Sequence, residues 1–335
     1  ASDVYKRQVL VERITGCGAR LGLVGMVDLD SYDYTPESQA LIRATEGTVT
    51  SRIPPRVKIR EGASVESPHV MLLLDDRERE LIEPLYAIRD SLPGLYDLEL
   101  MLGGGHLRGW AVTGEPAEKV TAIIEKQQKG KSLYIAVGDG NHSLATAKTC
   151  WENIKKSGKF TEEQLKTHPA RHALVEICNL HSEALEFKPI HRLLTNVDVK
   201  DMLSFFEAEI TKQGLESTEG DEIVFEYVES GATAIKNSGI NITNRGDRLP
   251  VEILQGILDK YLETHGNVEI DYIHGDEALH GLVKETKGCG IFLQSIDKST
   301  LFPAINAGGV LPRKTFSIGE ANEKRYYMEC HKISM

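Results

Sequence analysis

The feature that most constrains this fold is a strand, a glycine-rich loop and a helix that follow one another directly. Residues 133–137 form a short apolar run that is typical of a buried strand. Beyond the loop, Leu144, Ala147 and Trp151 recur at the spacing of one helix face. The loop between them, called the glycine loop below, reads Gly138-Asp139-Gly140-Asn141-His142-Ser143. A strand that leads into a helix in this way predicts an α/β fold.

The rest of the chain alternates in the same manner. Two apolar runs around a glycine-rich turn near the N-terminus predict a hairpin. Pro36 opens a stretch predicted as a short helix, which ends at Gly47 and carries Arg43 and Glu46 one turn apart. Further strands are predicted at 70–74, 95–100, 107–112, 173–178, 223–227, 233–236, 269–273, 290–293 and 326–330, and further helices at 81–88, 116–128, 202–210 and 251–264. This alternation predicts mixed sheets with flanking helices.

The elements become shorter after about residue 196, which predicts two domains. Residues 1–195 are expected to form an α/β domain that carries the glycine loop. Residues 196–335 are expected to form a smaller C-terminal α/β domain that packs against it. The chain begins Ala1-Ser2-Asp3 without an initiator methionine, so we expect the N-terminal part of the first domain to be missing.

Composition excludes several classes of protein. A hydrophobic content of 41% in 335 residues supports a globular core. No apolar run reaches the ~20 residues of a membrane span, and no signal pattern opens the chain, so a cytoplasmic protein is predicted. A net charge of -11 argues against nucleic-acid binding. The five cysteines are scattered without a C-x-x-C pair, which indicates reduced thiols and no zinc site.

The glycine loop is the strongest candidate for a site that binds an anion. The first N–H groups of a helix have no acceptor inside the helix, and the helix dipole adds positive potential at the same place. Gly138 and Gly140 allow tight turning and close approach of the backbone. The alternative is that Asn141 or Ser143 only caps the helix. The loop matches neither the G-x-x-x-x-G-K-[ST] pattern nor a full dinucleotide fingerprint.

Several separated motifs together resemble the bacterial family known as domain of unknown function 1015. They are the glycine loop, Ala44-Thr45-Glu46-Gly47-Thr48, Pro54-Pro55-Arg56, His168-Pro169-Ala170-Arg171 and Leu311-Pro312-Arg313-Lys314-Thr315. The resemblance runs from about Val9 to the C-terminus. The loop of that family, usually Asp-Gly-His-His-Arg, is also similar to the phosphate loop of the ParB and sulfiredoxin-like group, which includes free serine kinases.

The resemblance implies that the loop binds a nucleotide phosphate beside a catalytic carboxylate. Asp139, Gly140 and His142 match the family loop, whereas Asn141 and Ser143 replace its first histidine and its arginine. A guanidinium is a strong planar contact for phosphate. The phosphate site therefore needs an arginine from elsewhere, and the candidates are Arg52, Arg56 and Arg171.

The remaining candidate residues are assigned by chemistry and position. Glu46 is either half of an ion pair with Arg43 or a general base for a hydroxyl, and the resemblance favours the base. Asp139 would bind Mg²⁺ or orient the acceptor, and His142 would balance charge during phosphoryl transfer. Candidates for substrate binding are Arg43, Thr48, His168, Lys314 and Thr315.

The leading hypothesis is a small-molecule phosphotransferase, similar to free serine kinases, that uses Mg²⁺ and ATP or another phosphate donor. Its partner would be a phosphorylated small molecule, with no nucleic acid and no membrane. The alternative is a regulatory protein that senses a nucleotide or phosphate without turnover. The residues specify neither the substrate, nor the donor, nor the oligomeric state.

Overall fold

The computed structural model describes residues 8–67, 70–228, 234–319, 321–324 and 327–335. The chain divides into two compact units. Unit 1 comprises Ala1–Glu186 together with Ile318–Met335, and unit 2 comprises Phe187–Ser317. The sequence predicted a boundary near residue 196, with residues 196–335 as the second domain. The chain instead crosses earlier and returns to unit 1 at Ile318, where no shift in composition marks the change.

Unit 1 is built on a sheet of nine strands in the order β3-β4-β9-β6-β10-β2-β1-β8-β7. Pairs β3–β4, β4–β9 and β6–β10 are parallel, and the other neighbours are antiparallel. The strands are β1 (Gln8–Thr15), β2 (Gly18–Asp28), β3 (Tyr32–Asp33), β4 (Ile42–Ala44), β6 (Met71–Leu74), β7 (Gly94–Glu99), β8 (His106–Val112), β9 (Ile135–Asp139) and β10 (His172–Asn179). The sheet is mixed, as the sequence predicted.

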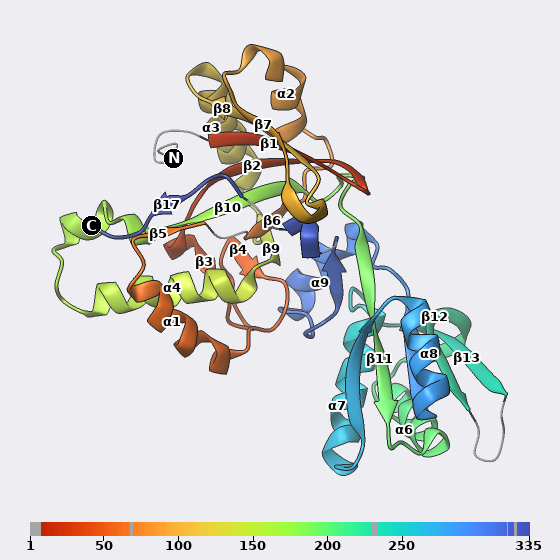
Figure 1. Ribbon diagram of the computed structural model, residues 1–335. Coiled ribbons are helices and arrows are strands. Elements are labelled where there is room, and N and C mark those ends of the chain that lie inside the picture. The colour runs from red at the N-terminus through yellow and green to blue at the C-terminus, as the bar shows by residue number, and fades with distance from the viewer. Residues whose placement is uncertain (1–7, 68–69, 229–233, 320, 325–326) are drawn as a thin grey trace. The chain divides into compact units, whose positions relative to one another are not determined.

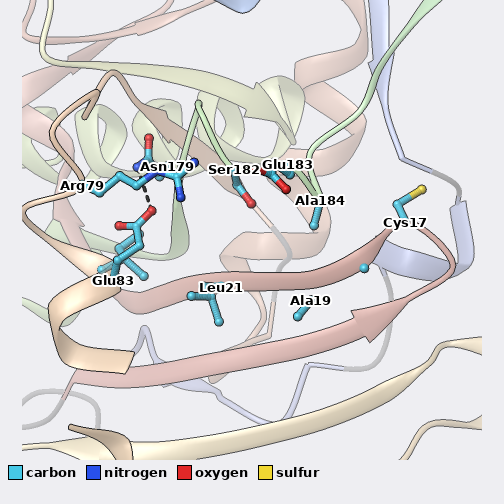
Figure 2. Close-up of a pocket in the computed structure, with 11 residues that line it drawn as sticks. Cys17, Ala19, Leu21, Arg79, Glu83, Asn179, Ser182, Glu183 and Ala184 are labelled. Atoms are coloured by element: carbon cyan, nitrogen blue, oxygen red, sulfur yellow. Dashed lines mark hydrogen bonds between the residues drawn. The ribbon is translucent and has the colours of Figure 1, made fainter. Parts of the chain in front are cut away.

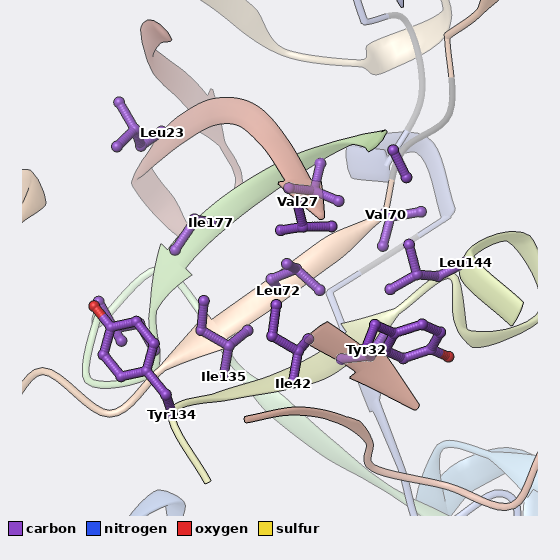
Figure 3. Packing of buried hydrophobic residues seen from close by; sticks show 14 of the residues in the cluster. Leu23, Val27, Tyr32, Ile42, Val70, Leu72, Tyr134, Ile135, Leu144 and Ile177 are labelled. Atoms are coloured by element: carbon purple, nitrogen blue, oxygen red, sulfur yellow. The ribbon is translucent and has the colours of Figure 1, made fainter. Parts of the chain in front are cut away.

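Helices cover one face of this sheet and enclose the main core. The helices of unit 1 are α1 (Ile53–Glu61), α2 (Ile82–Ala87), α3 (Glu115–Gln128), α4 (Asn141–Lys156) and α5 (Glu162–Lys166). Leu85 of α2, Val120 of α3 and Leu144 of α4 are buried in one cluster with Leu72 and Val137 of the sheet. Figure 3 shows the strand side chains of this cluster pointing toward one another. Burial at roughly 25 cal/mol per Å² makes such a cluster the main stabilising term.

The opposite face of the sheet is covered by the C-terminal segment, residues Ile318–Met335. Its strand β17 (His331–Lys332) pairs with β5 (Val65–Glu66), and the two lie beside β10 in Figure 1. Beneath it lie the buried side chains of Arg13, Arg20 and Glu176. Charged residues inside a sheet are tolerated only when they are paired, and their partners come largely from this segment.

Unit 2 has its own sheet and its own core. The strands follow the order β13-β12-β15-β11-β14, with β16 beside β11. Helix α8 packs across β11, β12 and β15, while α6 packs on β12 and on α7. The elements are β11 (Phe187–Thr195), α6 (Val199–Lys212), β12 (Glu216–Val228), β13 (Ile235–Thr243), α7 (Pro250–Thr264), β14 (Glu269–His274), α8 (Asp276–Thr286), β15 (Cys289–Leu293), α9 (Lys298–Gly308) and β16 (Phe316–Ile318).

Most elements confirm the sequence prediction, and two do not. The stretch predicted as a helix before Gly47 contains strand β4, because Ile42 and Ala44 pair with β9 in the core. The predicted strand at 326–330 lies partly outside the described residues, and residues 327–330 form no strand. Among the described helices, none combines the length and the apolar character that a bilayer span needs.

Candidate functional site

The glycine loop joins β9 to α4 as predicted, and the helix begins without a side-chain cap. Gly140 is the N-cap residue and has the left-handed conformation, with φ of 87°. The Ser143 N–H bonds the Gly140 carbonyl at 2.9 Å, and no side chain in the described part of the chain caps the helix. The interpretation of Asn141 or Ser143 as simple caps therefore fails. A 16-residue helix starts here with its positive end open.

The structure gives a different reason for a glycine at position 138 from the one that the sequence suggested. A Cβ at this position would lie 2.8 Å from Leu73 Cγ and 3.0 Å from Ile318 Cδ1. Real Cβ atoms do not approach other atoms so closely. Gly138 is thus required by packing of the sheet against the C-terminal segment, and the close approach is by protein side chains.

A cation from the C-terminal segment contacts the glycine loop. Lys324 Nζ lies 2.8 Å from Asp139 Oδ2, and the two side chains are 17% and 33% exposed. The other carboxylate oxygen of Asp139 accepts the Gly140 N–H at 2.7 Å. Sequence reasoning missed Lys324, because nothing in its local sequence distinguishes it and the contact joins residues far apart in the chain.

The chain after β4 lies along the same edge of the sheet as the glycine loop. Ala44 pairs with Val137 in parallel register, and Thr45 Oγ1 donates to the Val137 carbonyl at 2.7 Å. Asp139 is the last residue of β9, and the half-buried Glu46 follows Ala44, the last residue of β4, by two residues. Glu46 therefore comes just after the carboxyl end of the strand next to β9, where sites form in α/β sheets.

His142 connects the segment at 45–49 to helix α4 through a hydrogen bond. Its Nε2 accepts the Val49 N–H at 3.2 Å. The geometry makes His142 a positioning residue for the segment at 45–49. Its charge-balancing role stays a prediction.

Two oxygens near the start of α4 are buried without a hydrogen-bond partner among the described residues. They are Asn141 Oδ1 and Thr48 Oγ1. Buried polar atoms are normally hydrogen-bonded, and each exception calls for an explanation. A bound ligand with a hydroxyl or amide group would satisfy both atoms. This supports the prediction that Asn141 and Thr48 contact a ligand.

Of the predicted arginines, two lie on a helix that packs along α4. Helix α1 contacts α4 through a cluster that includes Ile53 and Ala145, and the two helices lie side by side in Figure 1. Arg52 immediately precedes α1, three residues after Val49, and Arg56 lies one turn further. Both side chains are exposed. Arg52 is therefore the better placed of the two to reach a ligand at the glycine loop.

Arg171 and His168 are not at the glycine loop. Arg171 binds Asp28 at 2.6 Å, and these hydrogen bonds raise its pKa. The ring of His168 packs 5.9 Å from that of Trp151. Trp151 is roughly 15 Å along the α4 axis from Asn141, at 1.5 Å per residue. Neither residue supplies the missing phosphate contact.

The functional groups of His168 and Arg43 are used inside the fold. His168 is buried, its Nδ1 accepts the Ala170 N–H at 3.1 Å, and burial lowers its pKa. The Arg43 guanidinium is also buried, which lowers its pKa, and it donates to the carbonyls of Ala40 and Ser132 at 2.8 and 2.6 Å. Ser132 precedes β9, so Arg43 points to the opposite end of that strand from the glycine loop. The predicted ion pair of Arg43 with Glu46 is replaced by these bonds.

Lys314 and Thr315 belong to unit 2. Lys314 has a positive φ of 62°, and its carbonyl accepts Arg192 Nη1 at 3.0 Å. Thr315 Oγ1 donates to the Pro312 carbonyl at 2.6 Å. Both residues thus shape a turn within their own unit, and their role in substrate binding stays a prediction.

The glycine loop offers one carboxylate to a magnesium ion, that of Asp139. Within the described ranges, no three His, Cys, Asp or Glu side chains cluster closely enough to hold a metal. Mg²⁺ commonly binds through one or two carboxylates together with substrate phosphates and water. Asp139 fits that arrangement only when a phosphate is bound beside it and Lys324 yields its carboxylate oxygen.

A separate pocket of about 280 Å³ lies at the other end of the sheet. Figure 2 shows Asn179 and Glu83 side by side in this pocket, joined by a hydrogen bond of 2.9 Å. Asn179 pairs with Leu74, whereas Asp139 pairs with Met71 at the opposite end of β6. None of the predicted site residues line the pocket. It is distinct from the glycine loop.

The protein has a mixed α/β fold, and its candidate site is the uncapped N-terminus of α4, which follows β9. A family model described as "Protein of unknown function (DUF1015)" matches residues 4–252, and the chain belongs to this family. The resemblance found in the sequence is thereby confirmed for residues 4–252. No curated protein matches the chain.

The chain is also similar to several solved structures at low sequence identity. A conserved hypothetical protein from Pyrococcus furiosus is 13% identical with a TM-score of 0.43, over 89% of this chain and 91% of that chain. A free serine kinase in complex with AMP is 13% identical with a TM-score of 0.45, over 88% and 87%. SbnI with C-terminal truncation from Staphylococcus aureus is 9% identical with a TM-score of 0.42, over 89% and 83%.

Proposed function

We propose that the glycine loop binds the phosphate of a small-molecule donor and that the protein is a phosphotransferase. The observation that carries this proposal is the uncapped, positive start of α4, which has the Lys324 ammonium beside it. The backbone N–H groups and the dipole at such a helix start are sufficient to bind a phosphate. ATP or another phosphate compound is the donor, and the acceptor is a small hydroxyl compound, for which free serine is the example that the loop sequence suggests.

The proposed reaction moves one phosphoryl group and one proton. The acceptor oxygen forms a bond to phosphorus while the bond from phosphorus to the leaving oxygen of the donor breaks. The acceptor proton passes to the carboxylate of Glu46, which follows the strand next to β9. Asn141 and Thr48 would hold the acceptor through their buried oxygens. When bound, Mg²⁺ would neutralise charge between Asp139 and the phosphate oxygens.

The test is a product assay with ATP, ADP or pyrophosphate, pooled amino acids and Mg²⁺, read by ³¹P NMR and mass spectrometry. We expect a phosphorylated small molecule. Glu46→Gln should lower turnover by roughly 10²- to 10⁴-fold, the usual contribution of a general base, while ligand affinity stays unchanged. Glu37→Gln, an exposed change ahead of the same strand, serves as the control and should keep full activity. Full activity in Glu46→Gln would remove the base from the mechanism.

One observation favours a second candidate, a sensor that binds phosphate without turnover. Both oxygens of Asp139 are engaged, one by the Gly140 N–H and one by Lys324. A carboxylate held in this way can stabilise the loop and take no part in chemistry. The same assay separates the two functions, because a sensor binds the nucleotide in calorimetry and gives no product with any acceptor.

A further inference from the structure

We propose that Lys324 is a phosphate-binding residue and that the C-terminal segment completes the site at the glycine loop. This inference rests on the proposed function of the loop. The family model ends at residue 252, far before Lys324. The segment is therefore a part of the site that neither the loop motif nor the matched region indicates.

The position of the segment is fixed by buried contacts on both sides of Lys324. Arg20 Nη1 donates to the Glu323 carbonyl at 3.3 Å, and Arg13 donates to the same carbonyl. Further along, Tyr327 donates to Glu176 at 2.5 Å. The partners come from β1, β2 and β10, which are neighbouring strands of the sheet. Lys324 is thus held beside the loop by the fold.

The segment is also fixed at its far end. Ser67 Oγ donates to the Glu329 carbonyl at 2.8 Å, and Tyr96 donates to the Glu329 carboxylate. His331 Nδ1 lies 3.0 Å from Glu66 Oε1 within the β5–β17 pair. A segment with so many buried anchors cannot move away from the sheet without breaking several of them. Movement of the lysine side chain alone costs far less.

The ammonium of Lys324 has capacity left for a ligand. It carries three donors, and one of them reaches Asp139. Because Asp139 directly precedes the N-cap Gly140, the ammonium lies next to the N–H groups at the start of α4. A phosphate at these N–H groups is within reach of the lysine. The lysine thus takes the part of the arginine that the family loop has and this loop lacks.

The experiment measures binding of pyrophosphate with Mg²⁺ to the full chain by calorimetry. Lys324→Met should weaken binding roughly ten- to a hundredfold, as expected for the loss of a hydrogen bond to a charged group. Lys332→Met is the matched control, because Lys332 lies on the same segment and is exposed in β17. It should bind like the wild type. Thermal unfolding checks that both variants are folded, and wild-type affinity in Lys324→Met overturns the proposal.

A second comparison separates direct contact from simple neutralisation of Asp139. Lys324→Met is introduced into the Asp139→Asn background, where no carboxylate needs neutralising. A direct contact predicts that the loss of affinity persists in the Asp139→Asn background and is at least as large, because the ammonium is no longer shared with a carboxylate. A loss that disappears in the Asp139→Asn background overturns the proposal. Failure of the proposed function looks different, because wild type then does not bind pyrophosphate, or binds it as well when Gly140→Val disrupts the loop.

Discussion

At the residue scale, two glycines stand at opposite ends of α4 with the same kind of backbone conformation. Gly140 begins the helix with φ of 87°, and Gly158 follows its end with φ of 65°. An added Cβ at Gly158 would point into open space. For both, an L side chain in this region costs about 1–2 kcal/mol. The pair offers a comparison in which both glycines have a positive φ and only Gly140 lies in the glycine loop.

We therefore expect Gly140→Ala and Gly158→Ala to lower the free energy of unfolding by similar amounts. Only Gly140→Ala should weaken pyrophosphate binding, since strain there is relieved by a shift of the loop that displaces the first helix N–H groups. Urea unfolding gives the stabilities and calorimetry the affinities. Equal affinities in the two variants would exclude the glycine loop as the phosphate site.

A second prediction at this scale concerns His168 and pH. Burial lowers the pKa of His168, so below about pH 6.5 the unfolded chain takes up a proton that the folded chain does not. Stability due to this residue is present above that pH and is lost as the pH falls toward the folded pKa, by at most about 1.4 kcal/mol per pH unit. His168→Asn keeps an acceptor for the Ala170 N–H and should flatten the dependence. Urea unfolding of unit 1 between pH 7 and 5 measures it, and an unchanged slope would contradict the assignment.

At the scale of elements, one buried carboxylate is among the anchors of the C-terminal segment. Glu176 accepts hydrogen bonds from Tyr327 and Arg20. Burial alone would raise the pKa of this carboxyl, but Arg20 and Tyr327 outweigh burial and hold the pKa below its ordinary value. Removal of one partner from a buried charge pair leaves the other charge uncompensated.

Glu176→Gln should therefore lower the free energy of unfolding by about 3 kcal/mol or more. It should also raise amide hydrogen exchange in residues 327–335, because their anchor is weakened. Glu163→Gln is the control, since Glu163 forms an exposed ion pair with Lys166 at 3.0 Å that is worth less than about 1 kcal/mol. A Glu176→Gln protein as stable as this control would show that the buried pair does not anchor the segment.

The sequence predicts the elements whose pattern is local and misses those set by distant partners. The strand, loop and helix around Gly140 follow from an apolar run and a helical period. Strand β4 does not, because three residues gain strand geometry only by pairing with β9. The contact of Lys324 with Asp139 depends on a segment that returns after all of unit 2, and no local pattern encodes such a return.

The same limit explains the candidate residues that the structure sets apart from the loop. His168 and Arg171 precede a predicted strand, where sites form in α/β sheets, and Arg43 was predicted one helical turn from Glu46. Their side chains instead satisfy backbone carbonyls, a backbone N–H and Asp28 inside unit 1. Sequence position does not reveal which polar groups form hydrogen bonds within the fold and which are available to a ligand.

At the scale of the whole molecule, the two units differ in continuity. Unit 2 is one uninterrupted stretch, whereas unit 1 needs the C-terminal segment to cover a charged face of its sheet. Both tryptophans of the chain, Trp110 and Trp151, lie in unit 1. Tryptophan fluorescence therefore reports on unit 1 alone, while circular dichroism reports on both units.

We expect a chain that ends after Ser317 to lose the cooperative fluorescence transition of unit 1 and to keep part of its dichroism. The isolated fragment 187–317 should unfold cooperatively on heating, because its sheet and core are its own. The full chain is the reference for both signals. A normal fluorescence transition in the shortened chain would mean that the C-terminal segment is dispensable for unit 1.

The return of the chain to unit 1 has a consequence for protein synthesis. The glycine loop leaves the ribosome long before Lys324, which follows Asp139 by about 185 residues. At roughly 5–20 residues per second, the loop waits about ten to forty seconds for its lysine. During that time Arg13, Arg20 and Glu176 of the first sheet also lack the contacts that they make with the C-terminal segment. A nascent chain of this protein therefore carries an unfinished sheet face until the C-terminal segment has been made.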